Sequence, residues 1–435
     1  MSELSYHQLN QLYQQRSFSA LFSTDSRPRL RNCWQKSKQV LEQIFNSRVI
    51  IDKHLQHQRD LFRNFTDFKK AFDRVWHAGM WQVLRIFNIE KGLAQTIRAL
   101  HENSIRAVLL NSQLEVFFKI TVGVRQRRLL SSIPFNLFLE KTMQETLHDH
   151  HTSIFIGGRS ICNLRFADDI DVMGGSNGEL QDLTNTVVDR ATAYGMEGST
   201  EKSKIMSNST NKINADVSMN CQKLEEMTSF KYLGATLCKD GTCSAEIRIR
   251  IASATAAMAR LNKIWRCNTI TFTSKFKIYK SLVTAIFLYC CETWTLLADS
   301  ERNYPGFRTK CPRKRLCISY LEHKTSDWVR SKSNFIVGPQ ETLLTTAKGR
   351  KFAWFGHDTR HDSLSKIILQ GTLEGGRRRG RQRHCWMDNI KEWTSLPMPE
   401  LLTGACCRKD WKRTSAESSF VFPPDDPIRQ GTEMN

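Results

Sequence analysis

The sequence predicts an α/β protein in which helices pack against one face of a small sheet. Two short apolar runs flank an acidic turn in "NLRFADDIDVMGG" (163–175), which is the pattern of a β-hairpin. Amphipathic helical patterns come before and after this hairpin. Beyond residue 240 the patterns are helical only, which predicts a helical block after the sheet.

Alternating elements are expected before the acidic hairpin. They are, in order, a helix over 40–55, a short strand with Phe65, Asp67 and Lys69 on one side, two helices broken at Gly92 over 80–100, a hairpin over 107–120 and a helix over 135–150.

Three further elements are expected after the acidic hairpin. A helix over 179–196 should end at Gly195, a strand should cover 230–237, and a long Ala-rich helix should cover 244–265. This order predicts that the acidic hairpin lies in the middle of the sheet, where ordinary turns rarely gather carboxylates.

The charge of the chain is strongly positive. Lys and Arg total 64 against 43 Asp and Glu among 435 residues, a formal net charge of +21. An excess of this size favours a polyanionic partner, because each neutralised phosphate releases counterions. A basic protein without such a partner remains the alternative.

The cysteines and the apolar segments exclude other classes. The 13 cysteines are scattered and form no C-x-x-C pair, which argues against a disulfide framework and favours a reducing compartment. A zinc site built from His357, His361, His384 and Cys385 is a weak alternative. No signal peptide is visible, and the most apolar run, 282–291, is too short to span a bilayer. We therefore expect no membrane partner.

The acidic turn has the chemistry of a metal site. Two-metal phosphoryl transfer needs two or three carboxylates that converge to hold two Mg²⁺ ions. Asp168 and Asp169 supply two of them from the hairpin tip, and Asp67 is the best-placed third. The sequence therefore predicts one acidic cluster on adjacent strands.

Five motifs carry a resemblance to a known family. In chain order they are "DFKKAFDRVWHAGMW", "GVRQRRLLSSIPFNLFLEK", "LRFADD", "YGMEGSTEKSKIM" and "FKYLGATL". They resemble successive motifs of reverse transcriptases, and most closely those of non-long-terminal-repeat retrotransposons (long interspersed elements). Similarity continues through "LYCCETWTLL" and the segment from Ala353, so that it covers about residues 44–412.

The resemblance implies a right-hand polymerase. Residues 46–240 would form the palm with partial fingers, 241–300 a helical thumb-like region, and 301–435 a basic C-terminal region that contacts nucleic acid. Residues 1–45 match nothing in this reading. Only 66 residues precede Asp67, so we expect a chain that is truncated at its N-terminus.

The resemblance also implies roles for single residues. Asp67, Asp168 and Asp169 would hold two Mg²⁺ or Mn²⁺ ions, and Lys202 would be a general acid for the pyrophosphate. An exposed lysine without a role is the alternative for Lys202. The remaining assignments are Phe72, Gln126 and Arg127 for the nucleotide, Phe230, Tyr232, Leu233 and Gly234 for the primer grip, and Arg377, Arg378, Arg379, Arg381 and Arg383 for nucleic acid.

The implied function is RNA-directed DNA synthesis. An aromatic ring at Phe72 would reject a ribonucleotide by clash, and Ala167 before the aspartate pair also favours DNA over RNA synthesis. The implied partners are an RNA template, a DNA primer and deoxynucleoside triphosphates, and we expect the nucleus rather than the cytoplasm. A solvated charge run is the alternative for the arginine cluster at 377–383.

One motif departs from the family pattern. Arg127 and Arg128 stand where Gly-Cys is common, Ser131 and Ser132 lie where Ser-Pro is common, and Pro134 replaces an aliphatic residue. A large side chain in place of glycine should crowd the nucleotide. The alternative function is therefore a catalytically impaired, nucleic-acid-binding relic of such an element.

Overall fold

The fold is described from a computed structural model. It describes residues 27–102, 105–110, 113–119, 122–124, 129–147, 154–209, 214–297, 313, 316, 318, 320–338, 341–376 and 383–418. The chain divides into two compact units. The first contains residues 1–43 and 59–227, and the second contains residues 44–58 and 228–435. Within the described ranges no helix is long and apolar enough to cross a membrane.

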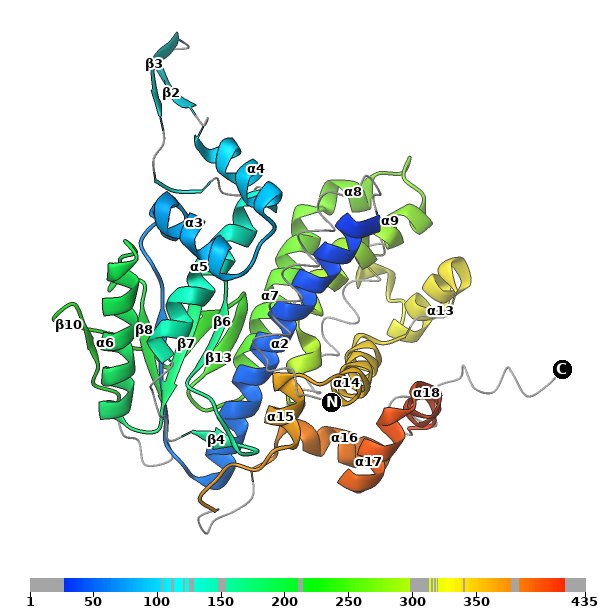
Figure 1. The fold of residues 1–435 in the computed structure, drawn as a ribbon. Helices are drawn as coiled ribbons and strands as arrows, with labels where there is room; N and C mark the ends of the chain where they lie inside the picture. The colour runs from blue at the N-terminus through cyan, green and yellow to red at the C-terminus, as the bar shows by residue number, and fades with distance from the viewer. Residues whose placement is uncertain are drawn as a thin grey trace. The chain divides into compact units, whose positions relative to one another are not determined.

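A five-stranded sheet is the centre of the first unit (Figure 1). Its order is β11-β8-β1-β7-β6, and every neighbouring pair is antiparallel except β11 and β8. The strands are β1 (Leu61–Thr66), β6 (Asn163–Phe166), β7 (Asp169–Gly174), β8 (Lys204–Asn208) and β11 (Glu225–Glu226).

The other elements of the first unit are mostly helices and short hairpins. They are the start of α2 (Arg27–His57), η1 (Ala71–Asp73), α3 (His77–Ile86), α4 (Lys91–Glu102), β2 (Ile105–Leu110), β3 (Gln113–Lys119), α5 (Leu129–Leu147), β4 (Phe155–Ile156), β5 (Arg159–Ser160), α6 (Asn177–Ala193), β9 (Ser218–Met219) and β10 (Gln222–Lys223).

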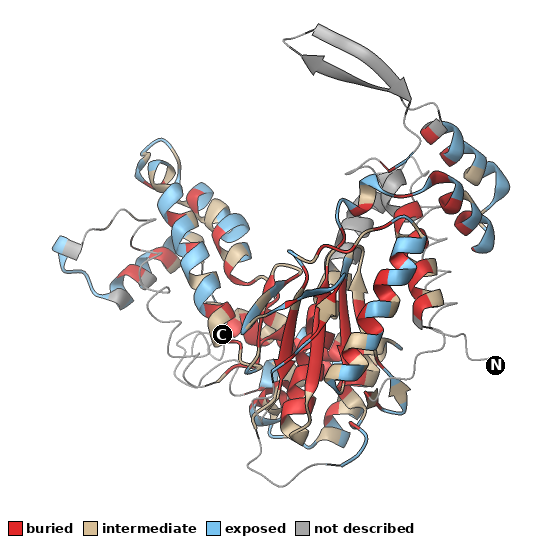
Figure 2. Cartoon of the chain, turned by 90° about the vertical axis from the view of Figure 1, so that its left-hand side faces the viewer, coloured by how far each residue is buried: buried red, intermediate tan, exposed pale blue. Residues whose placement is uncertain are grey.

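The two faces of the sheet differ in chemistry. Phe62 of β1 and Ile170 and Val172 of β7 enter one apolar core together with residues of α5 and α6. Successive side chains of a strand alternate between faces, so Arg63 and Asp171 lie on the opposite face, where their buried side chains form an ion pair. Figure 2 shows the strands of this sheet largely buried.

The second unit is mainly helical. It contains residues of α2 from Ile44, a hairpin of β12 (Ser229–Tyr232) and β13 (Ala235–Cys238), and the helices α7 (Ser244–Arg260), α8 (Asn262–Arg266), α9 (Phe272–Ile278), η2 (Tyr279–Thr284), α10 (Ala285–Phe287), η3 (Cys291–Thr293), η4 (Tyr320–Glu322), α13 (Ser326–Val337), α14 (Leu343–Arg360), α15 (Leu364–Gln370), α16 (Trp386–Thr394), α17 (Met398–Cys406) and α18 (Arg408–Glu417).

Tryptophans form much of the core of this second unit. The ring of Phe45 on α2 meets Trp354 edge-on at 5.6 Å and Trp386 at 4.9 Å between centroids. Trp393 and Trp411 are buried as well. Aromatic residues that lie among charges in the sequence therefore belong to a packed interior, where such pairs stabilise the fold.

Several sequence predictions are confirmed. The helix over 40–55 lies within α2, the hairpin of 107–120 is β2 and β3, and the acidic hairpin is β6 and β7. The helix expected over 179–196 is α6, and Gly195 follows it with a left-handed φ of +79°. The mixture of helices with one central sheet is also as predicted.

Four predictions about elements are wrong. The acidic hairpin lies at an edge of the sheet, because β6 is the last strand and β8 and β11 extend the other side. The helix break expected at Gly92 falls between α3 and α4, where Asn88 has a left-handed φ of +50°, and Gly92 lies inside α4. The long helix over 244–265 is divided into α7 and α8 at Leu261.

The strand predicted over 230–237 is a hairpin instead. Leu233 and Gly234 have φ values of +48° and +82°, and Tyr232 pairs with Ala235 across them. Two successive left-handed residues are typical of a tight two-residue turn between antiparallel strands. The sequence signal was the "LG" dipeptide, which is weaker than Asn-Gly.

Candidate active site

Asp67 directly follows the buried strand β1. Its backbone N–H donates to Ser203 Oγ at 3.1 Å, and its backbone carbonyl accepts from the Ser199 N–H at 2.8 Å. These bonds tie the residue to the segment that leads into β8. Its side chain keeps 38% of its surface exposed, so the carboxylate lies at the rim of the sheet and is open to a ligand.

The acidic hairpin brings two more carboxylates to the end of the strands where Asp67 lies. Phe166 pairs with Asp169, so that Ala167 and Asp168 form a two-residue turn. Ala167 has a left-handed φ of +53°, a conformation that a small side chain tolerates better than a large one. Thr66 pairs with Ile170 in the register of β1 and β7, and this brings the next residue, Asp67, close to Asp169.

The three carboxylates interact electrostatically. Burial by the surrounding protein, followed by the charges of Asp168 and Asp67, raises the pKa of Asp169 to about 6. Burial and the charge of Asp67 also raise the pKa of Asp168, and the charge of Lys202 opposes this. Like charges held close together disfavour the ionised forms. The strand register thus places residues about 100 positions apart near enough to influence one another's pKa.

Lys202 lies beside this cluster. Its Nζ is 3.6 Å from Asp67 Oδ1, and both side chains reach solvent. An exposed ion pair of this kind is weak, so the amine can leave Asp67 for another anion. The structure thus places the predicted general acid next to a carboxylate of the cluster.

The donor chemistry of the cluster fits a divalent cation. Carboxylate oxygens are the ligands that Mg²⁺ prefers, and a cation between them would favour the ionised form of Asp169, whose pKa is raised by burial and then by the charges of Asp168 and Asp67. Within the described residues, however, no three His, Cys, Asp or Glu side chains are close enough to form a ready-made metal site. The carboxylates would have to move closer together to share an ion.

Phe72 is anchored five residues after Asp67. Its ring stacks on the buried ring of Phe135 from α5, with centroids 4.0 Å apart and planes at 20°. Its carbonyl accepts from the Val124 N–H at 2.7 Å. The ring is half-buried, so it has a core role and also keeps an accessible part.

The other residues predicted to contact the nucleotide cannot be placed in the same way. Gln126, Arg127 and Arg128 lie outside the described residues. Pro134 lies inside α5, where it is buried directly before Phe135. A proline at such a position removes one helical hydrogen bond. Pro134, one of the departures from the family pattern, therefore weakens α5 next to Phe135, the residue on which Phe72 stacks.

The predicted primer grip belongs to the second unit. Phe230 and Tyr232 lie on β12, and Leu233 and Gly234 form its turn. Tyr289 Oη donates to the Leu233 carbonyl at 2.7 Å, and the guanidinium of Arg250 donates to the Gly234 carbonyl.

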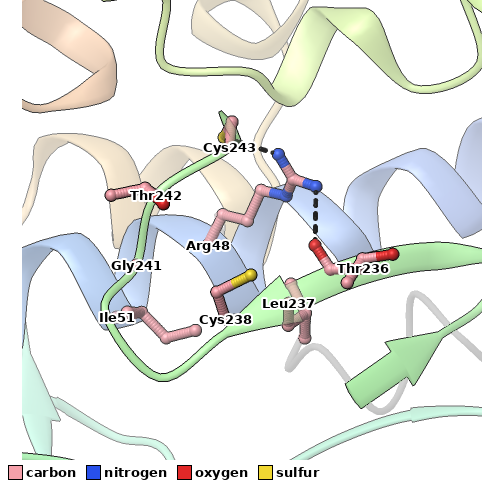
Figure 3. Close-up of a pocket in the computed structure, with 8 residues that line it drawn as sticks. All are labelled: Arg48, Ile51, Thr236, Leu237, Cys238, Gly241, Thr242 and Cys243. Carbon is pink, nitrogen blue, oxygen red and sulfur yellow. Dashed lines mark hydrogen bonds between the residues drawn. The ribbon is translucent and has the colours of Figure 1, made fainter. Parts of the chain in front are cut away.

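Helix α2 supports this hairpin from another side. Arg48 donates to Cys243 Sγ at 2.7 Å and to the Thr236 carbonyl of β13 at 3.2 Å (Figure 3). Ile51 and Gly241 line the same small pocket. The hairpin is thus held by side chains from α2 and α7 together with Tyr289.

The basic tail is only partly described. Arg377, Arg378, Arg379 and Arg381 lie outside the described residues. Arg383 is described, and its guanidinium donates to the Asp240 carbonyl. The weak zinc alternative has no support, because Asn389 and Glu392 contact His384 and no described group of His, Cys, Asp or Glu forms a metal site.

Sequence reasoning missed the residues that support these sites. Glu197 contacts Lys69 and Arg74 close to Asp67, and Tyr289 and Arg250 hold the hairpin turn. Glu197 lies in the quoted motif "YGMEGSTEKSKIM", but the sequence gives no sign of its contacts with Lys69 and Arg74. Arg250 and Tyr289 carry no local signal, because their partners are backbone carbonyls.

Comparison with known families agrees with this geometry. The family model described as reverse transcriptase (RNA-dependent DNA polymerase) matches residues 4–237, which is more than half of the chain. The chain belongs to the reverse transcriptase family. The match starts well before residue 44, where the resemblance read from the motifs begins.

The curated relatives of this reverse transcriptase chain come from mobile elements. An uncharacterised transposon-derived protein of Caenorhabditis elegans is 23% identical over 246 residues, covering 54% of this chain and 86% of that protein. The RNA-directed DNA polymerase from mobile element jockey of Drosophila melanogaster is 24% identical over 249 residues, 55% of this chain and 26% of that protein. These names confirm the predicted resemblance to retrotransposon reverse transcriptases.

Other similarities are shorter or more distant. The Pol polyprotein of a type-2 retrotransposable element of Drosophila melanogaster is 26% identical over 159 residues, 35% of this chain and 15% of that protein. The chain therefore spans only a small part of the fly polymerases it matches. Among solved structures, apo telomerase from Candida tropicalis matches with a TM-score of 0.39 and 12% identity, over 84% of this chain and 61% of that chain.

Proposed function

We propose that this chain carries the catalytic site of an RNA-directed DNA polymerase of a retrotransposon. The observation that carries the proposal is that Asp67, directly after β1, and Asp168 and Asp169, at the tip of the β6–β7 hairpin, lie at the same end of these neighbouring strands in a member of this family. The partners would be an RNA template, a DNA primer and deoxynucleoside triphosphates. The site of action would be the nucleus.

The three aspartates would hold two Mg²⁺ or Mn²⁺ ions. When bound, such ions lower the pKa of the primer 3′-hydroxyl and neutralise charge on the triphosphate. Paired strands hold these carboxylates in place, because β1 and β7 pair from Phe62 with Gly174 to Thr66 with Ile170, directly beside Asp67 and Asp169. Lys202, 3.6 Å from Asp67, would give its proton to the leaving pyrophosphate.

Other residues would bind and select the substrates. Phe72, fixed by its stacking on Phe135, would exclude a ribose 2′-hydroxyl. Gln126 and Arg127 would lie near the incoming nucleotide. The turn at Leu233 and Gly234 would hold the primer, and the arginines at 377–383 would contact nucleic-acid phosphates.

A catalytically impaired relic is the second candidate. The observation that favours it is Pro134, which is buried inside α5 next to the residue that supports Phe72. In a relic of this kind, nucleic acid would still bind through the positive charge of +21, but nucleotide use would be weak.

Primer extension on poly-rA/oligo-dT with Mg²⁺ or Mn²⁺ separates the two candidates. If the full chain extends the primer, Asp168→Asn should lower the extension rate by about 100-fold or more, since metal-held charge stabilisation contributes several kcal/mol. Asp216→Asn, an exposed carboxylate paired with Lys223, is the matched control. A wild-type chain that binds the duplex but does not extend it would favour the relic.

A second measurement does not need activity. Without divalent ions, Asp168→Asn should raise the unfolding temperature at pH 7.5, because it removes a charge that repels Asp169. The folded-state pKa of Asp169, about 6, lies above the ordinary 3.8, so stability falls as pH rises through this window. The increase in unfolding temperature that Asp168→Asn gives over wild type should therefore become smaller toward pH 4. Equal unfolding temperatures at pH 7.5 would contradict the carboxylate cluster.

A further inference from the structure

One carboxylate next to the aspartate cluster holds two cations. Glu197 Oε1 is 2.7 Å from Lys69 Nζ, and its Oε2 is 2.6 Å from Arg74 Nη2. The hydrogen bond from Lys69, with the charge of Arg74, lowers the pKa of Glu197, so it is ionised at neutral pH. Two oxygens that each accept from a different cation resemble the way a phosphate group is bound.

The two cations lie close to Asp67 in the chain. Phe68 is buried and forms a β-bridge with Gly198, so its neighbours Asp67 and Lys69 lie on the other side of this extended segment. Arg74 follows directly after η1, the turn that carries Phe72. Lys69 and Arg74 thus flank Phe72 in the sequence and meet at Glu197, and Lys69 lies on the same side of the segment as Asp67.

The side chain of Glu197 is not needed to hold this segment. The Lys69 N–H donates to the Glu197 carbonyl at 2.8 Å, and the Ser199 N–H donates to the Asp67 carbonyl, whatever side chain residue 197 has. The side chains of Lys69, Arg74 and Glu197 are 46%, 43% and 40% exposed. Exposed ion pairs are weak, and an incoming polyphosphate can reach and replace this carboxylate.

We propose that Lys69 and Arg74 form a polyphosphate-binding pair, and that Glu197 occupies this pair in the ligand-free chain. This inference rests on the proposed function, in which the polyphosphate is the triphosphate of the incoming nucleotide. Arginine and lysine both bind phosphate well, and arginine does so through two parallel hydrogen bonds. Glu197 thus competes with the nucleotide and lowers its affinity.

Binding of inorganic tripolyphosphate, measured by calorimetry in EDTA, tests the proposal without catalysis. Glu197→Gln should bind about 2- to 30-fold more tightly than wild type, as expected for removing two exposed ion pairs. Lys69→Ala and Arg74→Ala should each bind more weakly. The increase in tripolyphosphate affinity should disappear in the double variant Glu197→Gln/Lys69→Ala.

The matched control is Asp216→Asn, which frees Lys223 from another exposed pair of the same unit at 2.8 Å. An equal gain in this control would show a general charge effect and overturn the proposal. Unchanged or weaker binding by Glu197→Gln would also overturn it, because Glu197 would then position the cations rather than compete. Failure of primer extension with this binding pattern intact would count against the polymerase activity and not against the pair.

Discussion

Replacing Asp171 with alanine is expected to lower the free energy of unfolding by about 3–5 kcal/mol, because it leaves a buried guanidinium without its counter-ion. Arg63 Nε donates to Asp171 Oδ1 at 3.1 Å, and a second bond joins Arg63 Nη2 to Oδ2. Both side chains have no exposed surface. Burial raises the pKa of Asp171 and the charge of Arg63 opposes this shift, so the carboxylate depends on its partner.

The same pair determines how well the candidate site is held. Arg63 belongs to β1, which ends directly before Asp67, and Asp171 belongs to β7, which begins at Asp169. Amide hydrogen exchange measured by mass spectrometry should therefore show faster exchange in 61–66 and 169–174 for Asp171→Ala, together with the lower stability in urea. Exchange in helices of the second unit should change little.

Two controls separate pairing from burial. Replacing both partners, Arg63→Met with Asp171→Leu, should restore most of the stability, since an apolar pair of similar volume needs no counter-ion. Asp216→Ala, which breaks an exposed pair, should cost less than about 1 kcal/mol. Wild-type stability in Asp171→Ala would contradict the view that this buried pair supports the sheet.

The candidate site was predictable because its signals are local. Asp168 and Asp169 lie between two alternating apolar runs, and this pattern alone predicts a hairpin with carboxylates at its tip. Asp67 follows a short apolar strand, and the family motif supplied its pairing with the hairpin. Each of these residues is placed by the strand that it borders, so the sequence contained the information.

What could not be predicted depends on pairing over long distances in the chain. Nothing near residue 204 indicates that β8 and β11 extend the sheet beyond β1, and this extension makes β1 the central strand in place of the acidic hairpin. Arg63 reads as a surface residue until its partner, 108 positions later, is known. Charged residues that are buried in pairs break the usual hydrophobic pattern, so composition and periodicity cannot find them.

A second charged residue of this type lies in the core of the helical unit. Lys351 on α14 is fully buried, and its Nζ donates to the Trp294 carbonyl at 2.9 Å and to Asn389 Oδ1 at 2.7 Å. The amine also lies 4.4 Å from the ring centroid of Trp386 and 5.4 Å from that of Trp393. Burial lowers its pKa to about 7, although the ring faces favour the charged form.

This shift predicts how the stability of the helical unit depends on pH. Between pH 7 and 10 the unfolded chain binds a proton at Lys351 that the folded chain has lost, so stability should rise with pH in this window. The rise should amount to about 2–5 kcal/mol, the upper value being the full effect of the shift without help from the rings. Lys351→Met should lack this rise, because methionine has a similar length and no titrating group.

The measurement is urea unfolding followed by tryptophan fluorescence at several pH values, in the presence of a reducing agent. Lys351→Met removes the side-chain donor to the Trp294 carbonyl and leaves Asn389 Oδ1 with the Leu296 N–H as donor, which costs about 1–3 kcal/mol at pH 10. Near pH 7 the wild type has lost the stability that its neutral amine gives at pH 10. The free energy of unfolding of wild type should therefore fall to that of Lys351→Met or below it. Lys366→Met, which replaces a lysine that reaches solvent and pairs with Asp362 at 2.9 Å, should follow the wild type throughout. Parallel stability curves for wild type and Lys351→Met would show that the amine remains charged when buried, held by the two indole faces and its two oxygen acceptors.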